Sequence, residues 1–276
     1  MTQPWVSVTA PATVPYRYGL FSAAAVLDPT DGREFMAGVQ WEPVCADAPA
    51  PATLAQACVQ DRPPMLLPSG VDLAQAGPPM RLYTGFTCAL PGREDLLERA
   101  RQQLGLIEQQ SVEHYAWTGE AGNRPRLADP DTEILGGSAA APVSAAAGLG
   151  LLEAFISDRT GAIGVVWAPR TAAAHLVGAQ LTRVEGPRMV APLGNPMVFA
   201  HTSGAGPDGQ LPAASDAWLY ATGPVVVRRG PVSLPTLPQA LSTATNEVFA
   251  VAQRPYLVGW GCAQAAVKVR LPDTAA

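Results

Sequence analysis

The sequence predicts an α+β protein, and three features of the chain carry that prediction. A single long amphipathic helix is expected over about residues 93–117. The second half of the chain holds short β-rich segments that at first alternate with helices. A stretch dense in proline precedes the long helix, and proline at that density excludes long helices and central strands.

Residues 1–40 are expected to form an extended arm. Val6–Thr9 alternates like a short strand, and in Tyr16–Phe21 aromatic and polar residues take turns. An arm of this composition has little hydrophobic core of its own.

The proline-rich stretch runs from Trp41 to Pro79 and is expected to be a long excursion from the folded body. It is interrupted only by the helix-compatible Leu54–Cys58. Loops of this length are uncommon in compact domains and are usually functional or bound to a partner.

A strand over Leu82–Cys88 is followed by the long helix. Glu94 and Asp95 stand in its first turn, where the helix dipole favours acids, and Thr118–Gly119 ends it. Gly105 in its middle costs about 1 kcal/mol relative to alanine, so the helix must depend on packing.

The second half begins after a polar linker over residues 120–142 and is expected to contain both helices and strands. Helices are expected at Ala145–Asp158 and Arg170–Gly178. The expected strands are Gly161–Trp167, Met197–Ala200, Trp218–Ala221, Val225–Arg228, Glu247–Val251, Tyr256–Gly259 and Ala265–Leu271.

The composition excludes several classes of function. Only 15% of the 276 residues are charged, the net charge is −5, and Pro and Gly number 28 and 26. The chain therefore has no global basic field to hold a nucleic-acid backbone. No secretion signal and no run of 18 apolar residues is found. Lys268 is the only lysine beside 17 arginines, so any lysine-amine chemistry must use it or be absent.

The cysteines and histidines match no metal or disulfide pattern. The four cysteines are far apart and are expected to be reduced core residues in a cytoplasmic setting. The alternative is a cysteine-nucleophile enzyme, with Cys88 or Cys262 activated by a histidine. The residues concerned are Cys45, Cys58, Cys88, Cys262, His114, His175 and His201.

Other candidate clusters have plain structural readings. Asp129, Asp131 and Glu133 match the opening of a calcium loop, but Ile134 stands where that loop needs glycine, so a solvated acidic loop is favoured. Gly161 and Gly164 precede a strand rather than a helix, which favours turn glycines over a phosphate site.

Two groups of arginines have two possible roles: they are exposed to solvent, or they pair with carboxylates of another subunit. They are Arg228 and Arg229, and Arg93, Arg99 and Arg101 of the long helix. No catalytic, cofactor-binding or metal-binding residue is predicted.

A series of short motifs over about residues 80–270 resembles the major capsid proteins of tailed bacteriophages of high-GC bacteria. The order and spacing of the motifs carry the resemblance. Gln253 and Gly261 depart from it, because the family usually has acids there. The motifs are Tyr83–Cys88 with the helix to Trp117, Ile163–Arg170, Trp218–Arg228, Thr245–Glu247, Ala252–Tyr256 and Gly259–Cys262.

The resemblance implies the Hong Kong ninety-seven (Johnson) fold and a viral structural protein. The implied parts are an N-terminal arm (1–40), an extended loop (41–80), a peripheral domain with a spine helix (81–144), an axial domain (145–225) and a return to the peripheral domain (226–276). Such a chain self-assembles into the icosahedral phage head around double-stranded DNA. An encapsulin-type nanocompartment with the same fold is the alternative.

The implied partners are other copies of the chain in hexamers and pentamers. Separate scaffold, portal and cement proteins are also possible partners, with packaged DNA nearby and no membrane. The particle would be assembled in the host cytoplasm and end as a virion. Residues 41–80 contain no lysine, so the lysine cross-links that some relatives use are expected to be absent. No fused scaffold segment is expected.

Overall fold

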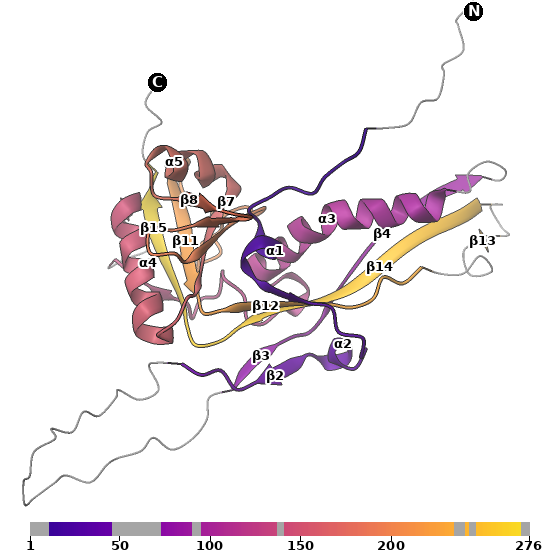
Figure 1. The fold of residues 1–276 in the computed structure, drawn as a ribbon, viewed down its shortest axis with the longest axis horizontal. Helices are drawn as coiled ribbons and strands as arrows, with labels where there is room; N and C mark the ends of the chain where they lie inside the picture. The colour runs from indigo at the N-terminus through magenta and orange to yellow at the C-terminus, as the bar shows by residue number, and fades with distance from the viewer. Residues whose placement is uncertain are drawn as a thin grey trace, which may run out of the picture.

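The computed structural model describes residues 11–45, 73–89, 95–136, 141–234, 241–242 and 247–271. The expected strand at Val6–Thr9 and helix at Leu54–Cys58 lie outside these residues, as do Arg93 and Glu94. A rounded part of the molecule surrounds one sheet, and an elongated part follows a long helix and strand away from it (Figure 1).

The larger sheet has eight strands and forms the rounded part. Seven lie in the order β5–β15–β11–β7–β10–β9–β8, and β6 also pairs with β15. Strands β7, β10 and β11 are buried along their whole length, which requires cover on both faces of the sheet. The bounds are β5 Glu133–Ile134, β6 Val143–Ser144, β7 Val165–Pro169, β8 Arg183–Glu185, β9 Arg188–Val190, β10 Pro196–Ala200, β11 Asp216–Thr222 and β15 Gln264–Arg270.

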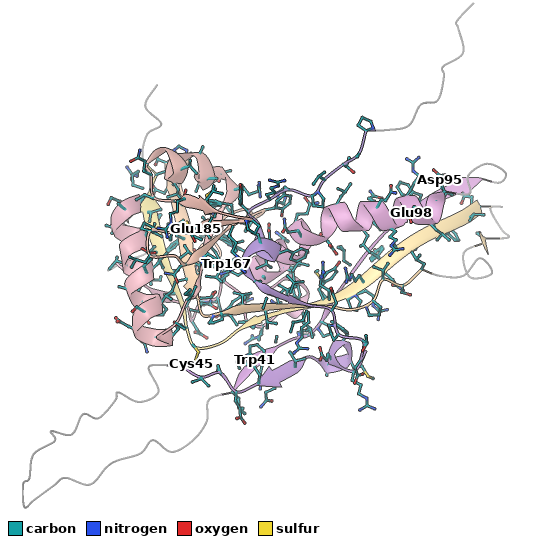
Figure 2. All side chains as sticks on the ribbon, in the orientation of Figure 1. Trp41, Cys45, Asp95, Glu98, Trp167 and Glu185 are labelled. Atoms are coloured by element: carbon teal, nitrogen blue, oxygen red, sulfur yellow. A yellow bond between two sulfur atoms is a disulfide. The ribbon has the colours of Figure 1, made fainter. Side chains whose placement is uncertain are left out.

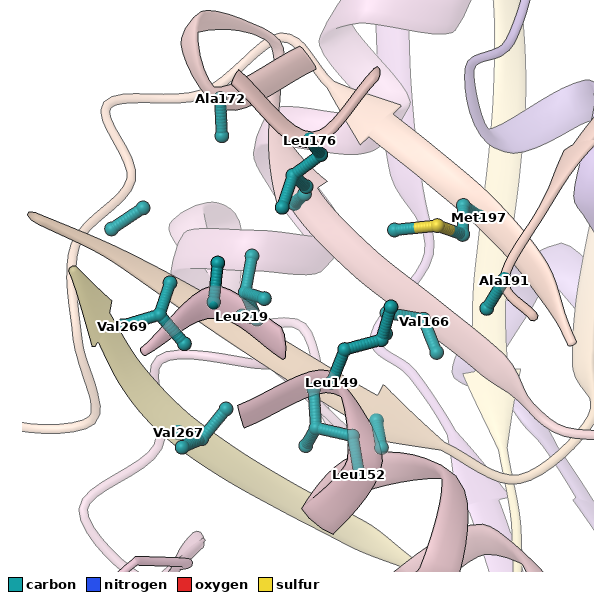
Figure 3. Packing of buried hydrophobic residues seen from close by; sticks show 14 of the residues in the cluster. Leu149, Leu152, Val166, Ala172, Leu176, Ala191, Met197, Leu219, Val267 and Val269 are labelled. Carbon is teal, nitrogen blue, oxygen red and sulfur yellow. The ribbon is translucent and has the colours of Figure 1, made fainter. Parts of the chain in front are cut away.

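Helices α4 (Ala145–Thr160) and α5 (Ala173–Gly178) cover one face of this sheet. Leu149 and Leu152 of α4 pack into one cluster with Leu219 and Val267 of the strands (Figure 3). The Ser144 hydroxyl accepts a hydrogen bond from the Ala147 amide and so caps α4.

The other face of the larger sheet is covered by α1 (Leu20–Ala23) and by the C-terminal end of α3 (Leu96–Thr118). The ring of Trp117 meets that of Tyr220 edge to face, with centroids 5.0 Å apart. The Trp117 indole N–H donates to the Ala205 carbonyl. The end of the long helix is therefore anchored in the rounded part of the molecule.

The smaller sheet follows the rest of α3. Strand β14 (Glu247–Trp260) pairs with β4 (Met80–Ala89), β12 (Val225–Arg229) and β13 (Leu241–Ser242), and β1 (Ala25–Leu27) pairs with β12. The N-terminal half of α3 lies along β4 and β14 (Figure 1). Leu96, Ala100 and Leu104 of the helix pack there against Ala250 and Ala252.

A third, two-stranded sheet lies beside β14. It pairs β2 (Val39–Trp41) with β3 (Ala74–Ala76), the two ends of the proline-rich stretch. The remaining short elements are α2 (Glu34–Ala37), η1 (Glu120–Gly122) and η2 (Arg170–Ala172).

Most predicted elements are present, and the long helix is confirmed with a start at Leu96 rather than 93. The prediction of two strands at 247–251 and 256–259 is wrong, because β14 is continuous. Pro255 does not break it. The Pro255 carbonyl accepts from Gly230, beyond the end of β12, so its missing N–H removes no bond from the ladder with β4.

Two further expectations need correction. Residues near Tyr18 do not stay extended, because Leu20 begins α1 and is fully buried against α3 and the larger sheet. Strand β15, expected with the last strands of the peripheral domain, instead pairs with β11 in the larger sheet. Cys262 adopts a φ of 68° in the turn before β15, and the chain crosses there from the smaller sheet to the larger one.

Candidate assembly site

A buried carboxylate of the long helix holds the root of the N-terminal segment. Glu113 has no exposed surface. It accepts hydrogen bonds from the Tyr16 hydroxyl at 2.6 Å and from the amides of Leu20 at 2.8 Å and His201 at 2.6 Å. One turn earlier, Gln109 accepts from the Phe21 amide and donates to the Tyr16 carbonyl. The N-terminal segment, α3 and the end of β10 therefore meet at one point.

The electrostatics of this point follow from burial. Loss of solvent raises the pKa of the Glu113 carboxyl above its ordinary value, although its three donors oppose the shift. Burial, followed by the nearby Glu113 charge, also raises the pKa of Tyr16. The Arg170 guanidinium lies 4.2 Å from the centroid of the Tyr16 ring and donates to the Phe199 carbonyl. These contacts make the root of the arm a fixed part of the folded body.

A second cluster of charges ties the segment after β1 to the smaller sheet. Arg229 binds both carboxylate oxygens of Asp28 at 2.9 Å, and Arg254 binds one of them at 2.9 Å. Both arginines also approach Glu108 of α3, at 3.4 and 3.3 Å, and Tyr256 donates to Glu108 at 2.7 Å. The hydrogen bond from Arg229 is the main cause that holds the pKa of Asp28 below its ordinary value.

The structure gives Arg228 and Arg229 a role within the chain, rather than solvation or pairing between subunits. Arg228 binds the two carboxylate oxygens of Glu34 on α2 at 2.7 and 2.6 Å. Neither arginine is simply solvated, and each already has carboxylate partners within its own chain. On the long helix, Arg99 lies 3.9 Å from Asp95 and stacks over the ring of Phe86.

The two ends of the proline-rich stretch pack directly on β14. A Cβ on Gly259 would lie 2.6 Å from Ala76 Cβ and from the Trp41 ring. A Cβ on Gly261 would lie 2.8 Å from Pro43 Cβ. Only glycine allows this close approach at these two positions.

A disulfide joins Cys45 to Cys262 at the same place, with the Cα atoms 5.3 Å apart (Figure 2). This finding corrects the prediction of reduced core cysteines for both residues. The sequence separation of 217 residues gave no sign of the pairing, because the fold alone brings the two segments together. The Cys262 sulfur is taken up by this bond, and no described histidine lines the hollow beside it to activate a thiol, so the structure gives no support to Cys262 as a nucleophile. Cys58 lies outside the described residues.

Several apolar side chains near these anchored segments are exposed. Val44 and Leu73, which flank the two-stranded sheet, are 96% and 53% exposed, and Met36 of α2 is 82% exposed. On β4, Tyr83 is 72% exposed and lies on the face that points away from α3.

The histidines give no catalytic cluster among the described residues. His114 and His201 line one hollow of about 440 Å³, where His114 lies 2.9 Å from Glu120, but no described cysteine lines it. His175 lies on α5, on the far side of the larger sheet. Nowhere in the described ranges do three or more His, Cys, Asp or Glu side chains gather as metal ligands would. No described helix is long and apolar enough to cross a membrane.

The remaining candidates have structural roles. Asp129 accepts from the Arg126 guanidinium and from the Asp131 amide, which organises the acidic turn. Gly161 has a φ of 60° and ends α4, as expected for a turn glycine. Lys268 lies on β15, is only 17% exposed and approaches Asp216 at 4.0 Å.

Sequence reasoning missed the residues that fix the arm and the proline-rich stretch. Glu113 and Gln109 are four residues apart among the buried positions of α3. A polar i, i+4 pair that interrupts an apolar face is the signal that points to a buried anchor. Asp28 and Cys45 give no comparable signal, because their partners lie about 200 residues away.

Comparison with known proteins gives matches only at the level of structure. No protein-family model matches the sequence, and neither does any curated protein. The capsid of an empty GTA particle is 11% identical with a TM-score of 0.55, and the matched region covers 98% of this chain and 95% of that one. The capsid of the native GTA particle gives 13% and 0.54 with the same coverage. A structure of Mycobacterium phage Adephagia gives 8% and 0.50 and covers 98% and 96%.

These matches extend over nearly the whole length of both chains. They confirm the expected fold, the Hong Kong ninety-seven fold of phage capsid proteins, although the sequence identity is only 11–13%.

Proposed function

We propose that this chain is a major capsid protein of a tailed bacteriophage or a closely similar particle, which assembles into an icosahedral shell around double-stranded DNA. The observation that carries the proposal is the full-length structural likeness to two GTA capsid structures. On this proposal the chain is a structural protein rather than an enzyme, and a component of the virion assembled in the host cytoplasm.

The anchored segments support the same function. Glu113 fixes the root of the arm, and the Gly259 contacts fix the two ends of the proline-rich stretch. In a shell subunit, the segments that leave these two roots would reach neighbouring subunits, so their direction of departure must be set by the folded body. Rigid roots meet that requirement.

We assign the parts of the chain as the resemblance implies. Residues 1–40 are the arm, 41–80 the extended loop, 81–144 the peripheral domain with α3 as its spine, and 145–225 the axial domain. Residues 226–276 are the return to the peripheral domain through the smaller sheet, except that their last strand, β15, lies in the larger sheet. The partners are other copies in hexamers and pentamers, with separate scaffold, portal or cement proteins where assembly needs them.

Expression of the full chain tests the proposal. The expected result is closed shells of uniform size, seen by electron microscopy and as a fast-sedimenting species, either from the chain alone or with proteins encoded beside it. A compact monomer under every ionic strength, concentration and co-expression condition would contradict it. Shells with an enclosed enzyme, and no portal or terminase gene nearby, would indicate an encapsulin-type compartment instead.

A further inference from the structure

The Cys45–Cys262 bond lies at a mechanically important place. Cys45 lies four residues beyond β2, at the root of the extended loop, and Cys262 forms the turn where the chain passes from β14 to β15. The bond therefore attaches the root of the loop to the junction between the two large sheets.

Packing contacts on both sides of the bond hold the two cysteines near each other. Trp41 and Ala76 pack on Gly259, and Pro43 packs on Gly261, one residue before Cys262. The Cα separation of 5.3 Å is within the ordinary range for a disulfide. With the bond open, the Cys262 sulfur would also have the Val44 carbonyl 3.6 Å away as a partner for its S–H group. These contacts are made by side chains other than the two cysteines, so we expect the chain with free thiols to hold the same arrangement.

The bond is also open to small molecules. Both cysteines line a surface hollow of about 460 Å³, together with Pro43, Leu73, Trp260 and Gln264. Thiol–disulfide exchange needs a direct approach of one sulfur to another, and a hollow of this size admits a small thiol or disulfide.

We propose that Cys45 and Cys262 form a redox-controlled clamp on the root of the extended loop. The two residues are thiols while the subunit folds and assembles, and they form a disulfide when the shell meets an oxidised low-molecular-weight disulfide. In that exchange the two protein thiols lose two electrons and two protons. One S–S bond forms in the protein, the S–S bond of the oxidant breaks, and two small thiols are released.

The timing rests on the proposed function, because a cytoplasm keeps thiols reduced whereas a released particle meets oxidising surroundings. The bond is within one chain, so it fixes the loop root without joining subunits. This inference adds a covalent element to a shell for which lysine cross-links are not expected.

The test uses the full chain purified under reducing conditions and then incubated with oxidised glutathione. Thiols counted after denaturation should fall from four to two per chain, and peptide mapping should identify the 45–262 linkage. Hydrogen exchange at the amides of β2 and β3 should slow several-fold, while exchange in β7 and β10 stays unchanged. Cys45→Ser and Cys262→Ser should abolish the slowing, and Cys88→Ser should respond like the unmodified protein.

Three results would overturn the clamp: retention of four thiols, a linkage that includes Cys58 or Cys88, or unchanged exchange at the loop root after the 45–262 bond forms. Failure of the clamp is distinguishable from failure of the proposed function. Shells that assemble without the bond leave the capsid role intact, whereas a clamped chain that never assembles overturns the capsid role and leaves the redox clamp standing.

Discussion

Glu113 is the residue on which the root of the arm depends most directly. Its Oε1 accepts from the Leu20 amide, and its Oε2 accepts from the His201 amide and the Tyr16 hydroxyl. Burying a charge is costly unless donors surround it. The three donors explain how an ionisable side chain can occupy a position without solvent.

Replacing Glu113 with glutamine should destabilise the protein by about 1–3 kcal/mol. The amide NH2 group must face either the Leu20 N–H or the His201 N–H, so one buried donor loses its acceptor. Chemical denaturation at pH 7 measures the effect. Glu98→Gln is the matched control on the same helix, because Glu98 is exposed; equal losses for both variants would contradict the role of Glu113.

The pH dependence of the same variant has a defined sign. Burial raises the pKa of Glu113 in the folded state above the ordinary value of 4.5, which applies to the unfolded state. At pH values between these two pKa values, the folded state therefore binds more protons than the unfolded state. The free energy of unfolding of the unmodified protein should therefore rise relative to that of Glu113→Gln as the pH falls through the folded-state pKa towards 4.5. Denaturation curves at several pH values measure this, and a difference independent of pH would refute the prediction.

Asp28 should show the opposite dependence. The Arg229 hydrogen bond holds its pKa below 3.8, so its stabilising contribution is present above pH 3.8 and is lost as the pH falls through its folded-state value. Asp28→Asn should be less stable than the unmodified protein at pH 7, by a modest amount because the carboxyl is half exposed. Denaturation curves at several pH values should show that the free energies of unfolding of the two proteins become equal in acid.

At the scale of elements, close packing holds the two-stranded sheet of β2 and β3 against β14. Gly259→Ala would bring a methyl group to 2.6 Å from Trp41 and Ala76, and should destabilise the protein by about 1–3 kcal/mol. Gly105→Ala in α3 meets no atom within 4 Å and should stabilise by about 0.5–1 kcal/mol. Thermal unfolding of both variants measures the contrast, and equal shifts would rule out the packing argument.

The elements that sequence could predict are those whose signals are local. The apolar spacing of α3 and the acids before it predicted the helix to within three residues at its start. The continuity of β14 could not be predicted, because Pro255 is tolerated only through the geometry of its neighbours β4 and β12. The order and spacing of the short motifs did predict the fold, which the structural likeness to the GTA capsids confirms.

The anchoring contacts could not be predicted, because they depend on contacts between distant segments. Asp28 meets Arg229 and Arg254 only after β1 pairs with β12. Cys45 lies beside Cys262 because residues 41–43 pack on Gly259 and Gly261. Local periodicity reports on a single element, and these contacts join elements from opposite ends of the chain.

At the scale of the whole molecule, the structure shows how some of the few charged residues are used. Three of the arginines, Arg228, Arg229 and Arg254, are used inside the chain to bind carboxylates of the N-terminal segment and α3. Exposed apolar residues such as Tyr83 and Val44 remain at the surface. Contacts between subunits in the proposed shell should therefore depend more on apolar burial than on ion pairs, and should weaken little as salt rises.

The lone lysine gives a final prediction about the assembled particle. Lys268 lies on β15 with its amine close to Asp216 and mostly covered, and residues 41–80, where the resemblance would place a cross-linking lysine, contain none. Lys268→Arg removes the only side-chain amine while keeping the positive charge. Shells should form in the same yield, and a denaturing gel should show only the 28.7 kDa chain for both proteins. Covalent multimers in the unmodified shells that disappear in Lys268→Arg would mean that the shell is held by lysine cross-links after all.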